Sequence, residues 1–193
     1  MRPLDPIKEN AIIQAVFTIA GTYGLAGITT ARISKEAGIG LGSLYTYFKT
    51  KEELIQEAYF RVEHVLTQKM YEGFDSTTPI KISLRSIYFN TLKYRLKHYN
   101  ETIFIDQYIQ SNYVQLNLEK QLRDFEFQHK PLYNLIEKGQ KEGILVGLPS
   151  FTLINFINGA IQSTTHGMVQ KLIPLKREAI EGGFRMMWKG ISS

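Results

Sequence analysis

The sequence predicts an all-α protein in which a small N-terminal helix-turn-helix unit precedes a larger helical region. Apolar residues recur at steps of three and four along most of the chain, and no run of convincing length alternates apolar with polar residues as a half-buried strand does. In addition, residues 28–54 show the pattern of two short helices joined by a glycine turn. These observations favour helices throughout, and the elements are taken below in chain order.

The first predicted helix begins at the Asp5-Pro6 pair and ends near Tyr23. Aspartate is a preferred N-cap, and proline fits the first helical turn because the N–H that it lacks has no partner there. Ile12 and Val16 then recur at helical spacing. We expect this helix to support the two short helices that follow it.

The second predicted helix covers residues 29–37 and has a small apolar face that includes Ile33. Either Thr29 or Thr30 can cap it, because a threonine oxygen accepts a hydrogen bond from a backbone N–H that the first turn leaves unpaired. Gly38 ends the helix, since glycine tolerates the left-handed conformation that closes a helix. The chain then restarts as a third helix after a turn of the length found in helix-turn-helix units.

The third predicted helix, residues 41–48, carries more hydroxyl groups than its packing requires. Leu44 and Phe48 lie four residues apart and fill the inward positions, so the other side chains point elsewhere. Small and hydroxyl-bearing residues allow close approach to bases and phosphates, and lysines follow where phosphates would lie. The alternatives are that the tyrosines are core aromatics and the lysines are solvated charges. The predicted DNA-binding residues are Thr29, Thr30, Arg32, Leu41, Gly42, Ser43, Tyr45, Thr46, Tyr47, Lys49 and Lys51.

This N-terminal quarter resembles the TetR family of bacterial transcription regulators. The turn, core and aromatic positions agree in order: Tyr23-Gly24-Leu25, Thr29, Ile33, Ala37-Gly38-Ile39, Gly42-Ser43-Leu44-Tyr45, Tyr47-Phe48 and Lys51-Glu52-Glu53-Leu54. The rest of the chain resembles the family only in length and helical character. Gly40 replaces the usual serine cap, and Leu41 replaces a polar or basic residue. Leu41 can contact a thymine methyl group instead, so the preferred operator sequence is left open.

The fourth predicted helix runs from Lys51 to about Tyr71 and is followed by a turn cluster at residues 73–79. We expect residues 1–50 to form a three-helix helix-turn-helix DNA-binding domain and residues 51–193 to form a helical ligand-binding and dimerisation domain. Pro131 should interrupt the third helix of the larger domain, because it removes a backbone donor and clashes with the preceding turn. The helices expected there are 80–100, 102–114, 118–143, 150–171 and 175–191.

The middle of the chain holds more aromatic residues than a small helical core needs. As a group they favour a pocket for a flat or apolar molecule, oriented by tyrosine hydroxyls or an imidazole. Core packing is the alternative for each residue taken singly, and the acidic residues nearby suit solvated helix faces at least as well as a cationic ligand. The predicted pocket residues are Tyr94, His98, Phe104, Tyr108, Phe125 and Tyr133.

The last two predicted helices have the features of a subunit interface. They combine an apolar stripe with glycines inside helices, which lower helix stability and indicate the close approach of another backbone. A two-fold dimer would place the third predicted helix of each subunit, residues 41–48, in successive major grooves about 34–36 Å apart. The resemblance implies that these helices form a four-helix bundle between subunits. The predicted interface residues are Phe151, Ile154, Ile161, Met168, Phe184, Met187 and Trp188.

Composition limits the class of protein further. A chain of 193 residues with 44% hydrophobic and 21% charged residues is globular and long enough for more than one core. The net charge of +5 favours an anionic partner. The sequence has no cysteine, no secretory signal and no apolar run of about 18 residues, so we expect a cytoplasmic protein that does not enter the membrane. Four scattered histidines and the lack of a nucleophile motif predict no metal site, no cofactor and no enzyme activity.

The resemblance implies a homodimeric repressor that holds a palindromic double-stranded operator and releases it when a small apolar or aromatic effector binds the larger domain. Two other functions remain open. One is a regulator without a ligand that a partner protein controls at the same helical surface. The other is a helical enzyme with a pocket and only incidental basic charge.

Overall fold

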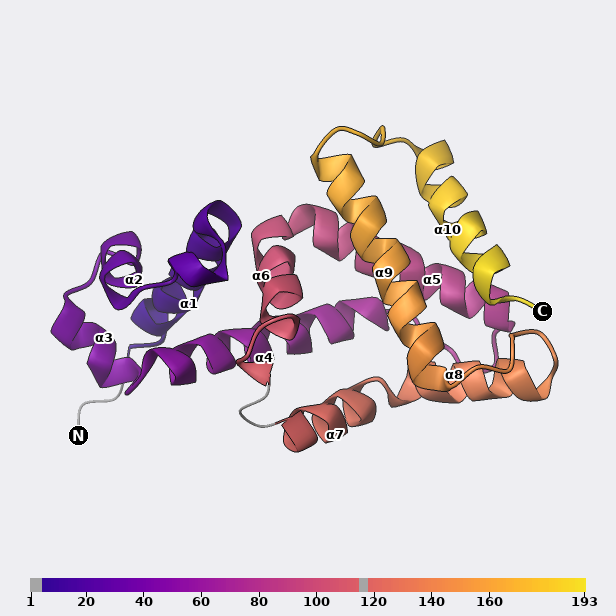
Figure 1. The fold of residues 1–193 in the computed structure, drawn as a ribbon, viewed down its shortest axis with the longest axis horizontal. Coiled ribbons are helices and arrows are strands. Elements are labelled where there is room, and N and C mark those ends of the chain that lie inside the picture. The colour runs from indigo at the N-terminus through magenta and orange to yellow at the C-terminus, as the bar shows by residue number, and fades with distance from the viewer. Residues whose placement is uncertain (1–4, 115–117) are drawn as a thin grey trace. The chain divides into compact units, whose positions relative to one another are not determined.

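The computed structural model describes residues 5–114 and 118–193, and Figure 1 shows their arrangement along the chain. Within these two ranges the regular elements are α-helices, short 3₁₀ segments and one isolated antiparallel bridge between Leu145 and Ser192. The all-α prediction is therefore confirmed. No helix in the described ranges is long and apolar enough to cross a membrane.

The N-terminal helices are α1 (Pro6–Tyr23), α2 (Thr30–Glu36) and α3 (Leu41–Tyr47), as predicted. Asp5 caps α1, since its carboxylate accepts a hydrogen bond of 2.9 Å from the backbone N–H of Ile7. Of the two threonines, Thr29 caps α2 by accepting a hydrogen bond of 3.3 Å from the backbone N–H of Arg32. A 3₁₀ helix, η1 (Leu25–Gly27), connects α1 to α2 and was not expected from the sequence.

The turn between α2 and α3 has the predicted glycine geometry. Gly38 adopts a φ of 66°, in the left-handed region that glycine enters without steric cost. The backbone N–H of Ile39 then returns to the carbonyl of Ser34 at 3.0 Å, which satisfies a carbonyl at the end of α2. The chain restarts at Gly40, which caps α3 without a side-chain hydrogen bond. This short, hydrogen-bonded turn joins α2 to α3 as a helix-turn-helix.

The chain divides into two compact units. The first comprises Met1–Val65 and His98–Leu118, and the second comprises Leu66–Lys97 and Glu119–Ser193. Helix α4 (Lys51–Met70) begins in the first unit and ends in the second. Helix α6 (Tyr99–Ile109), although it follows α5 in sequence, packs against α1 within the first unit.

The core of the first unit is aromatic where α1, α4 and α6 meet. The rings of Phe17 and Phe104 lie 5.3 Å apart, and the rings of Tyr59 and Tyr108 stack at 4.1 Å. At the surface of this unit the guanidinium of Arg61 pairs with a carboxylate of α1 and one of α4, those of Glu9 and Glu57. The first unit is thus built from helices distant in sequence.

Besides the end of α4, the second unit contains α5 (Ile80–Lys97), α7 (Leu118–Gln128), α8 (Lys130–Lys141), α9 (Ser150–Val169) and α10 (Arg177–Ile191). Helix α9 contacts α5, α8 and α10. The break between α7 and α8 falls at His129, with Pro131 in the first turn of α8. The predicted interruption near Pro131 is confirmed. The helix breaks here because proline is tolerated in a first turn but not in a helix interior.

Candidate nucleic-acid interface

Helix α3 buries one side and exposes the other. Leu44 is 2% exposed and Phe48, just after the helix, is 6% exposed, so both belong to the core of the first unit. Tyr45 and Leu41 are about half exposed, at 49% and 48%. Of the other residues predicted in this segment, Gly42, Thr46 and Lys49 are exposed, whereas Ser43, Tyr47 and Lys51 are half-buried.

Tyr47 connects α3 to the start of α1. Its hydroxyl oxygen accepts a hydrogen bond of 3.3 Å from the backbone N–H of Asp5. A phenol both accepts and donates, so the hydroxyl proton of Tyr47 is available for an acceptor such as a phosphate oxygen. The hydrogen bond to Asp5 fixes the place from which that proton is donated.

The corner between α3 and α4 is held by reciprocal capping. The backbone N–H of Glu53 donates to the hydroxyl of Thr50 at 3.0 Å, and the carboxylate of Glu53 accepts from the backbone N–H of Lys49 at 2.8 Å. This arrangement resembles a capping box and orients the first turn of α4. The two lysines of this corner, Lys49 and Lys51, therefore extend from fixed backbone positions.

Besides Tyr47, the predicted residues Thr29, Arg32 and Thr46 make side-chain contacts within the protein. The hydroxyl of Thr46 donates to the carbonyl of Gly42 at 3.2 Å. The hydroxyl of Thr29 is the N-cap of α2. The guanidinium of Arg32 donates from Nη1 to the carbonyl of Gly27 at 2.9 Å and lies over the ring of Tyr23, 4.6 Å from its centroid. Thr30, the first residue of α2, is half-buried.

The six predicted pocket residues are divided between the two compact units. Phe104 and Tyr108 are fully buried in the core of the first unit, where burial beside Glu63 and Tyr108 raises the pKa of Tyr59 well above its usual range. His98, also in the first unit, places Nδ1 3.1 Å from a carboxylate oxygen of Glu101. The burial of Phe104 and Tyr108 favours core packing, the alternative for each residue taken singly.

The other three predicted pocket residues belong to the second unit. Tyr94 is 7% exposed and is a core residue, whereas Phe125 and Tyr133 are half-buried against the core. The ring of Phe125 lies 4.2 Å from that of His129, whose Nδ1 is 3.1 Å from the hydroxyl of Tyr71. Burial raises the pKa of the Tyr133 hydroxyl, and the nearby Glu126 adds to this shift.

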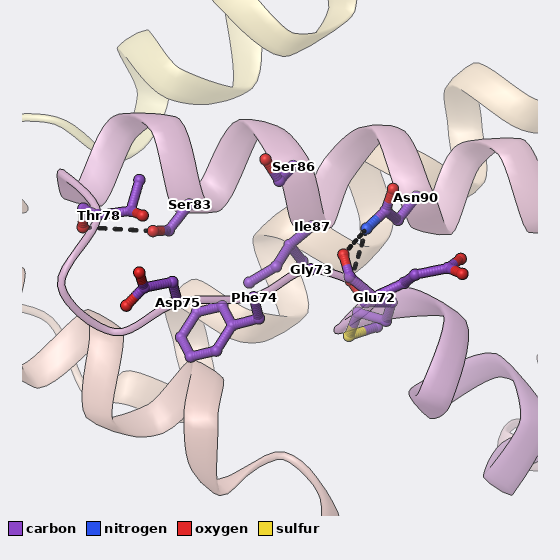
Figure 2. Close-up of a pocket in the computed structure, with 10 residues that line it drawn as sticks. Glu72, Gly73, Phe74, Asp75, Thr78, Ser83, Ser86, Ile87 and Asn90 are labelled. Atoms are coloured by element: carbon purple, nitrogen blue, oxygen red, sulfur yellow. Dashed lines mark hydrogen bonds between the residues drawn. The ribbon is translucent and has the colours of Figure 1, made fainter.

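A cavity of about 250 Å³, part of it open to solvent, lies at the turn between α4 and α5 (Figure 2). None of the six predicted pocket residues lines it. Its polar groups bind one another: the side-chain amide of Asn90 donates to the backbone carbonyls of Met70 and Glu72, at 3.3 Å and 2.9 Å. The carboxylate of Asp75 accepts from the backbone N–H and hydroxyl of Thr77, which lowers the pKa of Asp75. These hydrogen bonds hold the turn between α4 and α5 in place.

Replacing Asn90 with alanine should lower the free energy of unfolding by about 1–2 kcal/mol, because two carbonyls at the end of α4 lose their donor. Urea denaturation followed by circular dichroism measures this change. Asn134→Ala, at an exposed position of α8, is the matched control and should leave stability almost unchanged. Equal stability of the two variants would show that the amide contributes nothing.

Most of the predicted interface stripe lies in the core of the protomer itself. Five of its seven side chains are buried within the protomer; they are Ile154, Ile161, Met168, Phe184 and Met187. Helices α9 and α10 have apolar residues on two sides. The side with more of them packs into the protomer's own core. Phe151 is 48% exposed, and Trp188 is half-buried with the amino group of Lys81 5.3 Å from its ring centroid.

Several glycines expected at a subunit contact also face the protomer's own side chains. A Cβ atom on Gly183 would collide with the hydroxyl of Tyr88, and one on Gly167 would lie 2.6 Å from a methyl group of Ile173. Gly159, in contrast, has open space beside it. The sequence pattern correctly indicated close packing but did not distinguish packing within a protomer from packing between protomers.

A second apolar face remains outside on the same two helices, and the sequence reasoning missed it. Phe156 of α9 is 50% exposed and packs its ring against Gly190 of α10, where a Cβ would lie 2.8 Å from the ring. Met186, one helical turn before Gly190, is 77% exposed. The signal was present in the sequence, since Phe156 and Gly159 lie on one face at helical spacing.

Comparison with known proteins agrees with this architecture. Residues 12–58 match the family model described as bacterial regulatory proteins of the tetR family, and residues 59–193 match the tetracyclin repressor-like C-terminal domain. An uncharacterized HTH-type transcriptional regulator of Bacillus subtilis, YhgD, is 28% identical over 47% of this chain and 48% of its own. The regulator BetI 1 of Chromohalobacter salexigens is 38% identical over 28% of this chain and 27% of its own. This chain thus aligns with about half, or less, of the length of these relatives.

Solved structures share the fold over nearly the whole chain. A TetR family transcription regulator from Marinobacter aquaeolei VT8 superposes with a TM-score of 0.88, at 22% identity and with complete coverage of both chains. A TetR-family regulator from Haemophilus influenzae reaches a TM-score of 0.77 at 21% identity, covering 96% of this chain and 97% of that one. These proteins are described as transcription regulators and not as enzymes. Since family models match the chain from residue 12 to its last residue, the chain belongs to the TetR family of bacterial regulatory proteins.

Proposed function

We propose that the protein is a homodimeric transcriptional repressor that binds a palindromic operator through α3 and releases it when a small apolar or aromatic molecule binds. The observation that carries the proposal is the division of α3 into a buried side of Leu44 and an exposed side of Tyr45 and Thr46. A short helix whose packing leaves a row of hydroxyl-bearing side chains outside is suited to the major groove.

The proposal gives the predicted residues distinct roles. The hydroxyl of Tyr47, held at the start of α1, donates to a phosphate, and Lys49 and Lys51 bind phosphates beside it. Thr46 and Leu41 face base edges, where a hydroxyl forms hydrogen bonds and an apolar side chain contacts a thymine methyl group. Gly42 and Ser43 let the backbone approach the groove. Thr29 serves this surface indirectly, as the cap of α2.

Release by an effector is proposed as a population shift. In one conformer the two α3 helices of the dimer fit the operator, and in the other they do not. An effector that binds the second conformer more tightly weakens operator binding by the difference between its binding free energies for the two conformers, commonly about 1–3 kcal/mol. Helix α4 begins in one compact unit and ends in the other, so a movement of this helix can involve both. Screening apolar and aromatic compounds for operator release tests this step. If no compound releases the operator but a partner protein does, the regulator without a ligand is the better description.

Lys49→Ala should weaken binding to every duplex and reduce the slope of log affinity against log salt by about 0.9, because one phosphate contact is lost. Thr46→Ala and Leu41→Ala should instead change which sequence is preferred, with about 1–3 kcal/mol of discrimination at the affected base pair. Fluorescence anisotropy titrations on an operator selected from random duplexes measure both effects.

Lys141→Ala, which removes an exposed lysine of α8, is the matched control and should preserve affinity and slope. Selection that enriches no operator, or wild-type affinity in all three α3-region variants, would contradict the proposed DNA contact. Turnover of a substrate without salt-dependent DNA binding would favour the helical enzyme.

A further inference from the structure

Arg32 differs from the lysines of the proposed DNA surface because its guanidinium is engaged by the protein. Nη1 donates to the backbone carbonyl of Gly27 at 2.9 Å, and the guanidinium carbon lies 4.6 Å from the ring centroid of Tyr23. Tyr23 is the last residue of α1, Gly27 is the last residue of η1, and Arg32 lies in α2. One side chain thus joins three consecutive elements.

The carbonyl of Gly27 needs such a donor. It ends η1, and carbonyls at a helix end have no partner within their own helix. A hydrogen bond from a charged guanidinium is stronger than one from a neutral group, and the same planar group stacks on an aromatic ring. The guanidinium of Arg32 therefore donates to the Gly27 carbonyl and contacts the Tyr23 ring at the same time.

The corner is also packed tightly enough that only glycine fits at its centre. Gly27 is buried, and a Cβ there would collide with the Cβ of Tyr23 and lie 3.2 Å from Nη1 of Arg32. The backbone of η1 is closed by hydrogen bonds from Gly27 to Gly24 at 3.0 Å and from Ile28 to Leu25 at 3.2 Å. Tyr23, Gly27 and Arg32 thus form one contact unit, named here the α1–α2 clamp.

We propose that Arg32 is a positioning residue that fixes the α1–α2 corner, and not a residue that binds phosphate. Helix α2 contacts both α1 and α3, so the angle at this corner sets where α3 is held on the first unit. A clamp that keeps α3 in place before DNA arrives raises affinity by reducing the ordering needed on binding. This inference rests on the proposed DNA-binding function and assigns Arg32 a different part in it.

The test compares wild-type protein with Arg32→Ala, Arg32→Lys, Tyr23→Leu and the Arg32→Ala/Tyr23→Leu double variant. Operator affinity is measured by anisotropy across a series of salt concentrations. We expect Arg32→Ala to weaken binding roughly tenfold at every salt concentration with an unchanged slope. Tyr23→Leu should weaken binding in the same direction, and the double variant should lose less than the sum of the two losses, because both act on one contact unit.

Two results of the titrations would overturn the inference. A slope reduced by about 0.9 in Arg32→Ala would show that the guanidinium binds a phosphate. Full affinity in Arg32→Lys would show that a positive charge suffices, since an ammonium group lacks the planar fork that stacks on Tyr23 while bonding Gly27. Lys49→Ala in the same titration shows that a slope change of this size is detectable.

Hydrogen exchange in the free protein separates this inference from the proposed function. The amides of Gly27 and Ile28 should exchange faster in Arg32→Ala, Arg32→Lys and Tyr23→Leu than in wild type, without DNA present. Unchanged exchange in the folded Arg32→Lys and Tyr23→Leu variants would reject the clamp even if Arg32→Ala does not fold. If the wild-type protein binds no operator, the proposed function fails, but the exchange rates still decide whether Arg32 holds the corner.

Discussion

Replacing Phe156 with glutamate is expected to convert the proposed dimer into a monomer and to weaken operator binding by roughly a hundredfold or more, because two linked recognition helices bind far more tightly than one. Phe156 is 50% exposed on α9 and covers Gly190 of α10, so its ring lies on the apolar face that the protomer leaves outside. A carboxylate at this position would be buried without a partner in a dimer but solvated in a monomer. Sedimentation velocity and anisotropy titration measure the two effects.

The control for Phe156→Glu is Phe127→Glu, which makes the same change at a residue of α7 that is 80% exposed. It should remain dimeric and bind the operator as wild type does. Circular dichroism confirms that both variants retain their helices. A dimeric Phe156→Glu protein with wild-type affinity would place the subunit contact elsewhere.

Tyr108→Ala is expected to lower the free energy of unfolding of the first unit by about 3–5 kcal/mol, the range found when a buried aromatic side chain is truncated. Tyr108 has no exposed surface, and its ring stacks on Tyr59 at 4.1 Å. Removing it leaves a cavity between α4 and α6 that the neighbouring rings cannot fill without moving. Urea denaturation of the full chain measures the loss.

Tyr45→Ala is the matched control for Tyr108→Ala, because Tyr45 is 49% exposed and its truncation opens no cavity. Its unfolding free energy should lie within about 0.5 kcal/mol of the wild-type value. A Tyr108→Ala protein as stable as Tyr45→Ala would contradict the core role of Tyr108.

Most of the helices could be predicted because their signals are local. Asp5 and Pro6 mark the start of α1, Gly38 marks the turn before α3, and Pro131 marks the break between α7 and α8. Each signal depends on backbone groups within a few residues, so it can be read without knowing what the helix packs against. The exposed side of α3 was predictable for the same reason, once Leu44 and Phe48 were assigned to the core.

The partners of side chains could not be predicted in this way. Arg32 looked like a phosphate ligand because arginine often is one, yet its contacts with Tyr23 and Gly27 depend on how η1 folds back. Phe104 and Tyr108 looked like pocket residues because an aromatic cluster has the same sequence signature in a cavity and in a core. In both cases the residue type indicated which interactions were possible, but the tertiary fold determined which neighbours the side chain contacts.

The sequence alone determined the helical periodicity, the helix-turn-helix and the hydroxyl-rich side of α3, since these follow from spacing along a single helix. Only the tertiary structure decided that α6 joins α1 in the first unit and that Ile154, Ile161 and Met187 face inward while Phe156 stays outside. The physical reason is that hydrophobic burial is not directional: an apolar stripe must leave water, but its composition does not specify which surface will cover it.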